Sequence, residues 1–269
     1  MPSIPIKLPD HSAWKTQVSV IWALYLRETR TRFGKYNLGL IWALIEPMSM
    51  IAVKAALFGF ILKVTIPSIP YPIFLAAGFI PFRFFTGMVN RSVTAISSNQ
   101  ALLVYRQIKP LDPFIARLLQ EIVVSVLIGG IFLFAAAWLL AAPDFKRPLM
   151  ILISLTSLIM MSSGLGIFLG VLGHTHKELE KIVPMLTTPL LLISCVLYPL
   201  SRVPSNYQYL FIWNPLVVIF ESFRMGLYSH YPTPDLPIFY PLCCGIVSLW
   251  IGLAYYYKKF DILYLPSRV

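Results

Sequence analysis

The chain has 269 residues, of which 58% are hydrophobic and 12% are charged, and its formal net charge is +11. This composition is too apolar for a soluble domain of this size, so soluble enzymes and soluble binding modules are excluded. No polar stretch is long enough to fold separately, and a single membrane domain over residues 1–269 is expected. The three cysteines lie inside apolar runs and have neither the spacing of a metal site nor that of a disulfide framework.

Residues 10–35 are predicted to form an amphipathic helix at the membrane surface. Aromatic residues recur on one face at helical spacing, and arginines fall roughly opposite. An aromatic face beside a basic face suits the lipid headgroup region. The alternative is an ordinary amphipathic helix packed on its own protein. The residues expected at the headgroups are Trp14, Trp22, Arg27, Arg30, Arg32 and Lys35.

Long apolar runs predict an all-α polytopic membrane protein with six spanning helices. A bilayer core of about 30 Å requires roughly 20 apolar residues in a helix. In lipid the backbone must pair within its own segment, so such runs are helical. The expected spans are residues 38–62, 73–94, 114–142, 149–173, 182–201 and 238–257. Small residues at Gly166 and Gly170 permit close packing of the fourth span.

Polar residues interrupt the first two spans. Glu46 and Lys54 lie in the first, where either they reach the membrane surfaces or both face a polar interior. In the second span Pro81 predicts a kink, and Arg83 stands among four phenylalanines. An arginine at that depth requires water or a partner.

The basic residues predict the orientation. Most of the 22 lysines and arginines lie in the N-terminal arm, the loops after the second and fourth spans, and the C-terminal tail. The positive-inside rule therefore places both termini in the cytoplasm. This distribution also accounts for the basic surplus, so no nucleic-acid partner is expected.

Two segments depart from a plain helix bundle. Residues 99–110 are mixed polar and apolar and precede Pro113, which predicts a short helix parallel to the membrane; a solvated loop is the alternative. Residues 198–237 contain a short apolar stretch bounded by prolines, which predicts a re-entrant segment before the last span; an amphipathic external loop is the alternative. Glu221 and Arg224 in that region are spaced for an ion pair on one helix face.

Two motifs resemble those of type-2 ABC exporter permeases. The stretch from Arg27 to Pro47 resembles the entry of these permeases, in which a basic interface helix precedes L-G-x-x-W-x-x-x-x-P. The stretch from Asn214 to Arg224 is similar to their N-P-L-x(4)-E-x-x-R segment. Length and topology agree over essentially the whole chain. The chain looks most like permeases of group-2 capsular polysaccharide export, with O-antigen and teichoic-acid permeases as close relatives.

The resemblance implies a homodimer with two cytoplasmic ATPase subunits. ATP and Mg²⁺ would bind to those subunits, because this chain has no G-x-x-x-x-G-K-[ST] motif; it would bind no cofactor and be no enzyme by itself. Periplasmic and outer-membrane export components are also implied. The segment at 99–110 would be the coupling helix that contacts the ATPase, through Asn99, Leu102, Val104, Tyr105, Arg106, Lys109 and Pro110.

The resemblance also implies a lipid-linked capsular polysaccharide as substrate, moved from the cytoplasm across the bacterial inner membrane. Aromatic rings stack on sugars, and arginines attract anionic groups. The alternatives are an ordinary interfacial aromatic belt and an Arg224 paired with Glu221. The residues expected to line the path are Phe79, Phe82, Arg83, Phe84, Phe85, Tyr198, Tyr207, Trp213, Glu221 and Arg224.

Other functions remain open at this point. A small-molecule exporter of the same superfamily would not need the aromatic re-entrant segment. An integral membrane enzyme acting on lipid-linked sugars would need acids or histidines gathered near one membrane face, whereas the 4 histidines and 11 acids are scattered.

Overall fold

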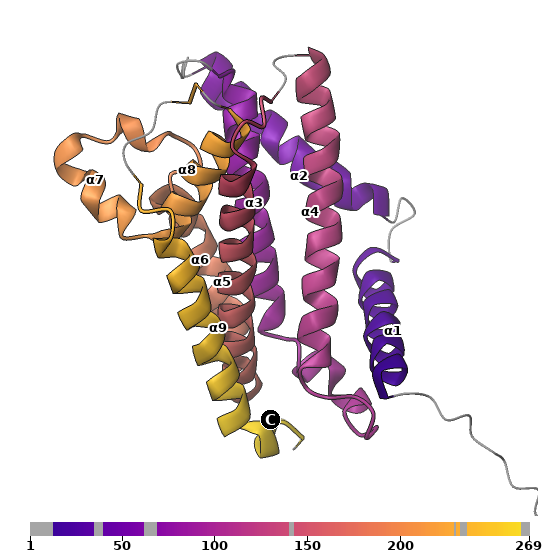
Figure 1. The fold of residues 1–269 in the computed structure, drawn as a ribbon. Coiled ribbons are helices and arrows are strands. Elements are labelled where there is room, and N and C mark those ends of the chain that lie inside the picture. Colours follow the sequence, from indigo (N-terminus) through magenta and orange to yellow (C-terminus); the bar gives the residue numbers. More distant parts are fainter. Residues whose placement is uncertain are drawn as a thin grey trace, which may run out of the picture.

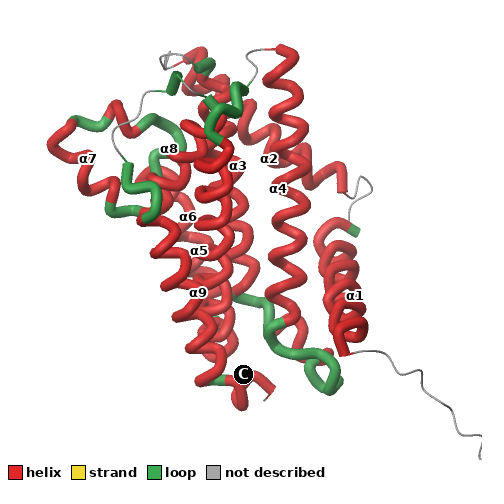
Figure 2. The backbone as a smooth tube through the Cα atoms, viewed as in Figure 1, coloured by secondary structure: helices red, strands yellow, loops and turns green. Residues whose placement is uncertain are grey.

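The computed structural model describes residues 13–34, 40–61, 69–139, 143–228, 230–231 and 236–264. Within these residues the regular structure is entirely helical, as Figure 2 shows, which confirms the predicted all-α class. The α-helices of the described part are α1 Ala13–Phe33, α2 Leu40–Ala55, α3 Tyr71–Ser92, α4 Asp112–Leu139, α5 Pro148–Thr175, α6 Leu179–Ile193, α7 Ser205–Ile212, α8 Pro215–Leu227 and α9 Tyr240–Lys258.

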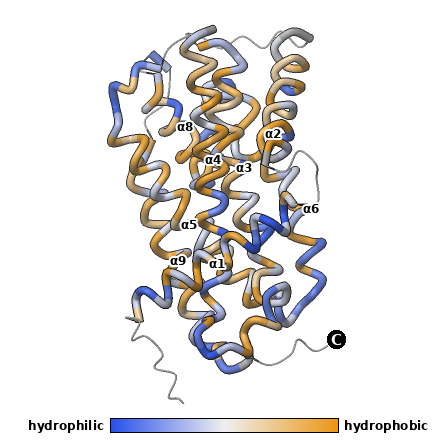
Figure 3. The backbone as a smooth tube through the Cα atoms, turned by 90° about the vertical axis from the view of Figure 1, so that its right-hand side faces the viewer, coloured by the Kyte–Doolittle hydropathy of each residue, from blue (hydrophilic) through white to orange (hydrophobic). Residues whose placement is uncertain are grey.

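Four predicted spans are present as long apolar helices. Each of α3, α4, α5 and α9 is long and apolar enough to cross a membrane. Hydrophobic residues run along them, whereas many hydrophilic residues lie in the connecting segments (Figure 3). Their bounds follow the predicted spans closely, because an uninterrupted apolar run in lipid has few solutions besides a helix.

The first predicted span is helical at every described residue, whereas the fifth predicted span is broken. The helix α2 has 16 residues and passes into a π-helical segment, Ala56–Ile61; residues 38, 39 and 62 lie outside the described part. The helix α6 has 15 residues and ends at Ile193, so the predicted span over 182–201 is broken. The described residues thus hold four helices long and apolar enough to cross a membrane, or five candidate spans if α7 and α8, which meet at 104°, form one broken span.

The helix α3 lies at the centre of the bundle. It contacts α2, α4, α5, α6 and α8, and most of its surface is buried (Figure 1). Phe82 of α3 meets Phe220 of α8 edge to face, with 6.3 Å between ring centroids. Because α3 is central, most of its aromatic side chains pack against the surrounding helices.

The helices α5 and α9 pack backbone against backbone. A Cβ atom at Gly252 of α9 would lie 2.3 Å from the carbonyl oxygen of Gly164. On another face of α5, a Cβ at Gly170 would lie 2.5 Å from the carbonyl oxygen of Ser92. The predicted close packing of this span is confirmed, and glycines provide it on two faces.

Different connecting segments lie at the two ends of the bundle. Figure 1 places the α3–α4 connection and the C-terminal end of α9 at one end. The α7–α8 hairpin and the α4–α5 connection lie toward the other end. The two segments that the sequence singles out are therefore on opposite sides of the bundle.

Candidate functional site

The first candidate site is the segment 97–111 between α3 and α4. A 3₁₀ helix, Ser97–Leu102, opens the segment. Tight turns follow, in which the Tyr105 N–H donates to the Leu102 carbonyl at 3.1 Å. The predicted helix over 99–110 is therefore corrected: only its first residues are helical, and i→i+3 bonds hold them. The segment is short and ends at prolines, which lack the N–H donors that would continue an α-helix.

The predicted coupling residues fall into an outward and an inward group. Val104 is 85% exposed and Tyr105 is 64% exposed. Together with the exposed Arg106 and Lys109 they form a projecting surface, which we call the exposed turn. The remaining predicted contacts lie further in: Asn99 and Pro110 are buried and Leu102 is half-buried. The contact surface available to a partner is thus smaller than the sequence predicts.

Asn99 lies beneath the exposed turn and joins the segment to α1. Arg27 donates from Nη1 to Asn99 Oδ1 at 2.6 Å and from Nη2 to the Ser98 carbonyl at 3.4 Å. The Asn99 amide donates to Glu28 Oε1 at 3.1 Å. Both sides of the Asn99 amide are therefore satisfied by residues of α1.

Two acids and three arginines connect α1 with the ends of α3 and α4. Glu28 of α1 accepts from Arg117 Nη2 at 2.9 Å and from Arg91 Nη2 at 3.2 Å. Glu121 of α4 accepts from Arg32 Nη1 at 2.8 Å and from Arg91 Nη1 at 2.9 Å. Arg91 therefore bridges both carboxylates. We call these five residues the acid–arginine network.

The network shifts the ionisation of the α1 residues. Burial alone would raise the pKa of Glu28, but Arg117, the Asn99 amide and Arg91 together bring that pKa below its usual value. Burial lowers the pKa of Arg32, and Glu121 opposes this shift. Charged partners therefore favour the ionised carboxylate of Glu28 within a partly buried site.

The basic arm is used differently from the headgroup expectation. Arg27 and Arg32 bind residues of this protein, whereas Arg30 is exposed and Lys35 lies outside the described residues. Trp14 and Trp22 are 75% and 59% exposed, so an apolar surface remains on α1.

The acid–arginine network was not predicted, because its members come from three separate helices. A signal was present: Arg117 and Glu121 stand one helical turn apart at the start of an otherwise apolar span. Such residues need partners at that depth, and Glu28 stands between arginines in the segment that precedes the first predicted span.

The second candidate site is the α7–α8 hairpin. Asn214 caps α8: its Oδ1 accepts from the Leu216 N–H at 3.0 Å, and its amide donates to Ser194 Oγ at 3.1 Å. Pro215 occupies the first helical position, where its missing N–H costs no hydrogen bond. The Asn-Pro-Leu motif thus starts a new helix at a sharp angle and ties it to the end of α6.

Glu221 and Arg224 form a buried pair beneath this hairpin. Arg224 Nη1 donates to Glu221 Oε1 at 2.8 Å and to the Cys195 carbonyl at 3.0 Å, and Nη2 donates to the Val196 carbonyl at 2.9 Å. The guanidinium also lies 3.7 Å from the centroid of Phe74. The carbonyls at a helix end need donors. Arg224 supplies them just past α6, where Cys195 has a left-handed φ of 52°. The expected i, i+3 ion pair is confirmed.

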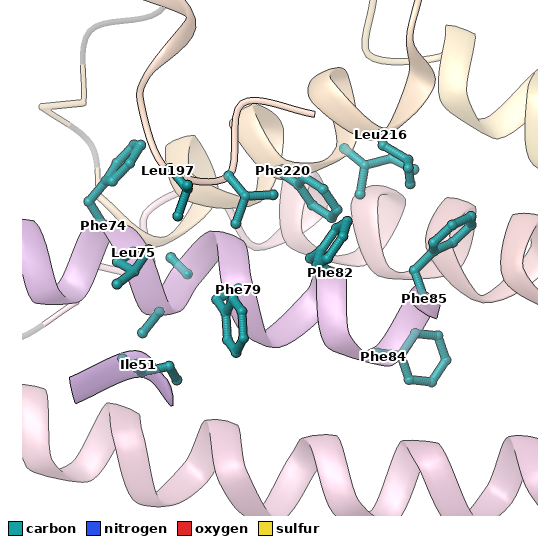
Figure 4. Packing of buried hydrophobic residues seen from close by; sticks show 14 of the residues in the cluster. Ile51, Phe74, Leu75, Phe79, Phe82, Phe84, Phe85, Leu197, Leu216 and Phe220 are labelled. Carbon is teal, nitrogen blue, oxygen red and sulfur yellow. The ribbon is translucent and has the colours of Figure 1, made fainter. Parts of the chain in front are cut away.

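Most residues predicted to line a path are part of the core of this chain. Figure 4 shows Phe79, Phe82, Phe84 and Phe85 among the packed side chains around α3. Each is 6% exposed or less, so most of their surface packs inside the described chain, although Phe84 and Phe85 also contribute to the walls of apolar clefts. The phenylalanines are enclosed because α3 is surrounded by other helices of this chain, and their role in a path stays a prediction. Glu221 and Arg224 are likewise enclosed, at 1% and 0% exposed.

Three predicted path residues remain accessible on or beside the hairpin. Tyr207 is 58% exposed and Trp213 is 79% exposed. Tyr198 is half-buried and donates its hydroxyl to the Leu192 carbonyl at 2.8 Å. The hairpin therefore presents aromatic rings outward over a buried ionic pair.

Arg83 connects α3 with α2 at membrane depth. Its Nη2 lies 3.8 Å from Glu46 Oε2, and the Arg83 side chain is 20% exposed. The Lys54 ammonium lies 5.0 Å above the Phe79 ring. Both charged residues of α2 thus have a partner on α3.

The described residues form a helical bundle with helices long and apolar enough to cross a membrane, a break before the last helix and buried polar pairs, as expected of an integral membrane protein. In the described residues no group of three or more His, Cys, Asp or Glu is placed to hold a metal ion. Residues 19–228 match the family described as ABC-2 type transporter, and the chain belongs to this family.

Three named proteins are similar to this chain over most of its length. The polysialic acid transport protein KpsM of Escherichia coli is 38% identical over 91% of this chain and 95% of its own length. The capsule polysaccharide export inner-membrane protein CtrC of Neisseria meningitidis is 26% identical over 88% of this chain and 90% of its own length. The O-antigen export system permease protein RfbA of Myxococcus xanthus is 24% identical over 88% of this chain and 91% of its own length.

Proposed function

We propose that this chain is the membrane subunit of an ATP-driven exporter that moves a lipid-linked capsular polysaccharide from the cytoplasm across the bacterial inner membrane. The observation that carries the proposal is the 38% identity to a polysialic acid transport protein over 91% of this chain. A second relative is named as an inner-membrane protein of capsule polysaccharide export, which supports the location.

The working transporter would contain two copies of this chain and two cytoplasmic ATPase subunits. The chain has no phosphate-binding G-x-x-x-x-G-K-[ST] motif, so ATP and Mg²⁺ would be bound by the ATPase subunits. The exposed turn offers them a compact contact. Trp42 and Val53 on α2 are 44% and 66% exposed, and such an apolar face suits a second copy. Periplasmic and outer-membrane components would carry the polymer onward.

The proposed topology has six spans, both termini in the cytoplasm and α1 on the cytoplasmic membrane surface. The α3–α4 connection and the C-terminal end of α9 lie at the same end of the bundle, which supports this orientation (Figure 1). That end carries Arg106, Lys109 and Lys258. In this arrangement α2 and α6 are completed as spans by the segments that follow them.

The substrate path would lie beside the hairpin, between the two copies. Tyr207 and Trp213 are exposed there and can stack on sugar rings. Arg83 is half-buried and can attract an anionic group once its weak pairing with Glu46 opens. The four α3 phenylalanines and the Glu221–Arg224 pair would support this path from behind.

Deletion of the gene in the host tests the proposal. We expect surface capsule to disappear while the polymer accumulates inside the cells, as detected by polymer-specific antibody before and after permeabilisation. Complementation with the intact gene is the control. Loss of polymer synthesis would instead indicate a membrane enzyme, and normal surface capsule would contradict the proposal.

O-antigen export is a second candidate, favoured by the match to RfbA over 88% of this chain. The same deletion strain distinguishes the two. Loss of O-antigen from lipopolysaccharide with normal capsule would support this candidate and not the first.

A further inference from the structure

An apolar cleft of about 390 Å³ opens between α4 and α5, with α3 and α8 at its base. Its walls are apolar except for Ser125. A narrow extension of about 50 Å³, also lined by Gly129, continues toward Tyr228. The cleft lies within helices that are long and apolar enough to cross a membrane, so hydrocarbon is its expected surrounding.

Two adjacent glycines keep the cleft open. A Cβ atom at Gly129 or at Gly130 would meet no other atom within 4 Å. Other helical glycines of this chain allow a close approach, as Gly252 does against Gly164. At Gly129 and Gly130 no neighbour approaches, so their lack of a side chain leaves space along the helix.

Basic residues stand at one end of this cleft. Phe145 forms part of its lining, and Lys146 and Arg147 follow directly, both exposed. Asp144 precedes them, which leaves this connection with one positive charge in excess. Pro148 then begins α5, and no side chain caps that helix, so its N-terminal amides add to the positive potential. An anionic group is therefore favoured at the mouth of a hydrocarbon-lined cleft.

We propose that this cleft binds an anionic phospholipid of the bilayer. One acyl chain lies along Gly129 and Gly130, and the phosphate lies near Lys146, Arg147 and the start of α5. The charge at the mouth favours this occupant over a helix from a second copy, because a helix packed there would need an acid at the membrane surface to match it. Each basic residue near a membrane surface contributes about a fivefold preference for an anionic lipid.

The test uses the full chain in nanodiscs that contain phosphatidylglycerol or phosphatidylcholine with a photoreactive group in the acyl chain. We expect labelled peptides from α4 and α5, with more label from phosphatidylglycerol. Gly130→Leu adds a side chain into the cleft at a position where a Cβ meets no neighbouring element within 4 Å, and we expect it to reduce this labelling at least threefold for both lipids. Ala254→Leu, on the exposed side of α9, is the matched control and should leave the labelling unchanged.

Separate variants test the contact between the protein and the lipid headgroup. Lys146→Gln with Arg147→Gln should reduce labelling by phosphatidylglycerol at least fivefold and leave phosphatidylcholine labelling unchanged. Lys258→Gln, an exposed basic residue at the other end of the bundle, is its control. Gel filtration of each variant checks that it folds. If Gly130→Leu does not fold, Val126→Trp replaces it, because Val126 lies on the exposed rim of the cleft and a tryptophan there would fill it.

Three outcomes would overturn the proposal. One is equal labelling by the two lipids in the unchanged protein. Another is unchanged labelling in the cleft-filling variant. The third is a cross-link across the cleft from a second copy of the chain, which would make it a protein interface.

Discussion

The surroundings of Arg224 suit the forked side chain of an arginine better than that of a lysine. The planar guanidinium bonds Glu221 and the carbonyls of Cys195 and Val196 at the same time. A lysine ammonium is a compact charge and does not span these three acceptors. The site therefore holds the broken backbone after α6 against α8 through one side chain.

A double-mutant cycle tests this role. Removing one partner of a buried ion pair leaves an uncompensated charge and costs about 3–5 kcal/mol. We expect Arg224→Met to lower the free energy of unfolding in detergent by that amount. Adding Glu221→Leu should recover part of the loss, because the stranded carboxylate is then absent. A double variant as unstable as the sum of the two single variants would contradict the buried pair.

Glu28 predicts an acid sensitivity of the α1 attachment. Its pKa in the folded protein lies below the usual value of 4.5. A depressed carboxyl pKa contributes stability above the unfolded pKa, and this contribution is lost as pH falls through the folded pKa. The unchanged protein should therefore have a higher free energy of unfolding than Glu28→Gln near neutral pH. This difference should shrink below about pH 4.5. Thermal melting across pH measures it; a difference independent of pH would contradict the charge assignment.

At the scale of elements, the residues exposed on the turn differ from the residue that attaches its segment to α1. Arg106 and Lys109 point outward, whereas Asn99 is committed to α1. We expect Arg106→Glu with Lys109→Glu to reduce co-purification of the partner ATPase at least fivefold, because the contact surface then carries the opposite charge. Lys258→Glu reverses an exposed charge on α9 and is the control. Unchanged recovery of the ATPase would place the docking surface elsewhere.

The α5–α9 contact depends on the absence of side chains. Gly252→Leu would place a Cβ 2.3 Å from the Gly164 carbonyl oxygen, so the helices must separate. Overpacking of this kind costs about 1–3 kcal/mol. We expect a lower melting temperature in detergent for Gly252→Leu, while Ala254→Leu, exposed on the same helix, changes it little. Equal melting of the two variants would contradict the close approach.

Sequence patterns predict the long helices well and the breaks poorly. The run at 149–173 becomes α5 almost unchanged, because lipid leaves an apolar run few alternatives to a helix. The run at 182–201 is equally apolar, yet its helix ends at Ile193. The carbonyls released there bind Arg224, which lies 28 residues beyond Val196 in sequence. A local pattern carries no information about such a distant partner.

At the scale of the whole molecule, local sequence patterns likewise predict only part of the candidate sites. The sequence predicts the Glu221–Arg224 pair from i, i+3 spacing, and this pair is present. It does not predict that the α3 phenylalanines are enclosed, since enclosure depends on how the other helices are arranged around α3. Residues far apart in the sequence, such as Arg32 and Glu121, likewise meet only after the bundle forms.

The hydrogen bonds of Asn99 have a mechanical consequence. Its amide is held by both Arg27 and Glu28, and Glu28 is held in turn by Arg117 of α4. A force applied to the exposed turn would therefore not dissipate in a flexible linker. It would act on α1 and α4 at the same time, so that work done at the exposed turn would be transmitted to two helices together.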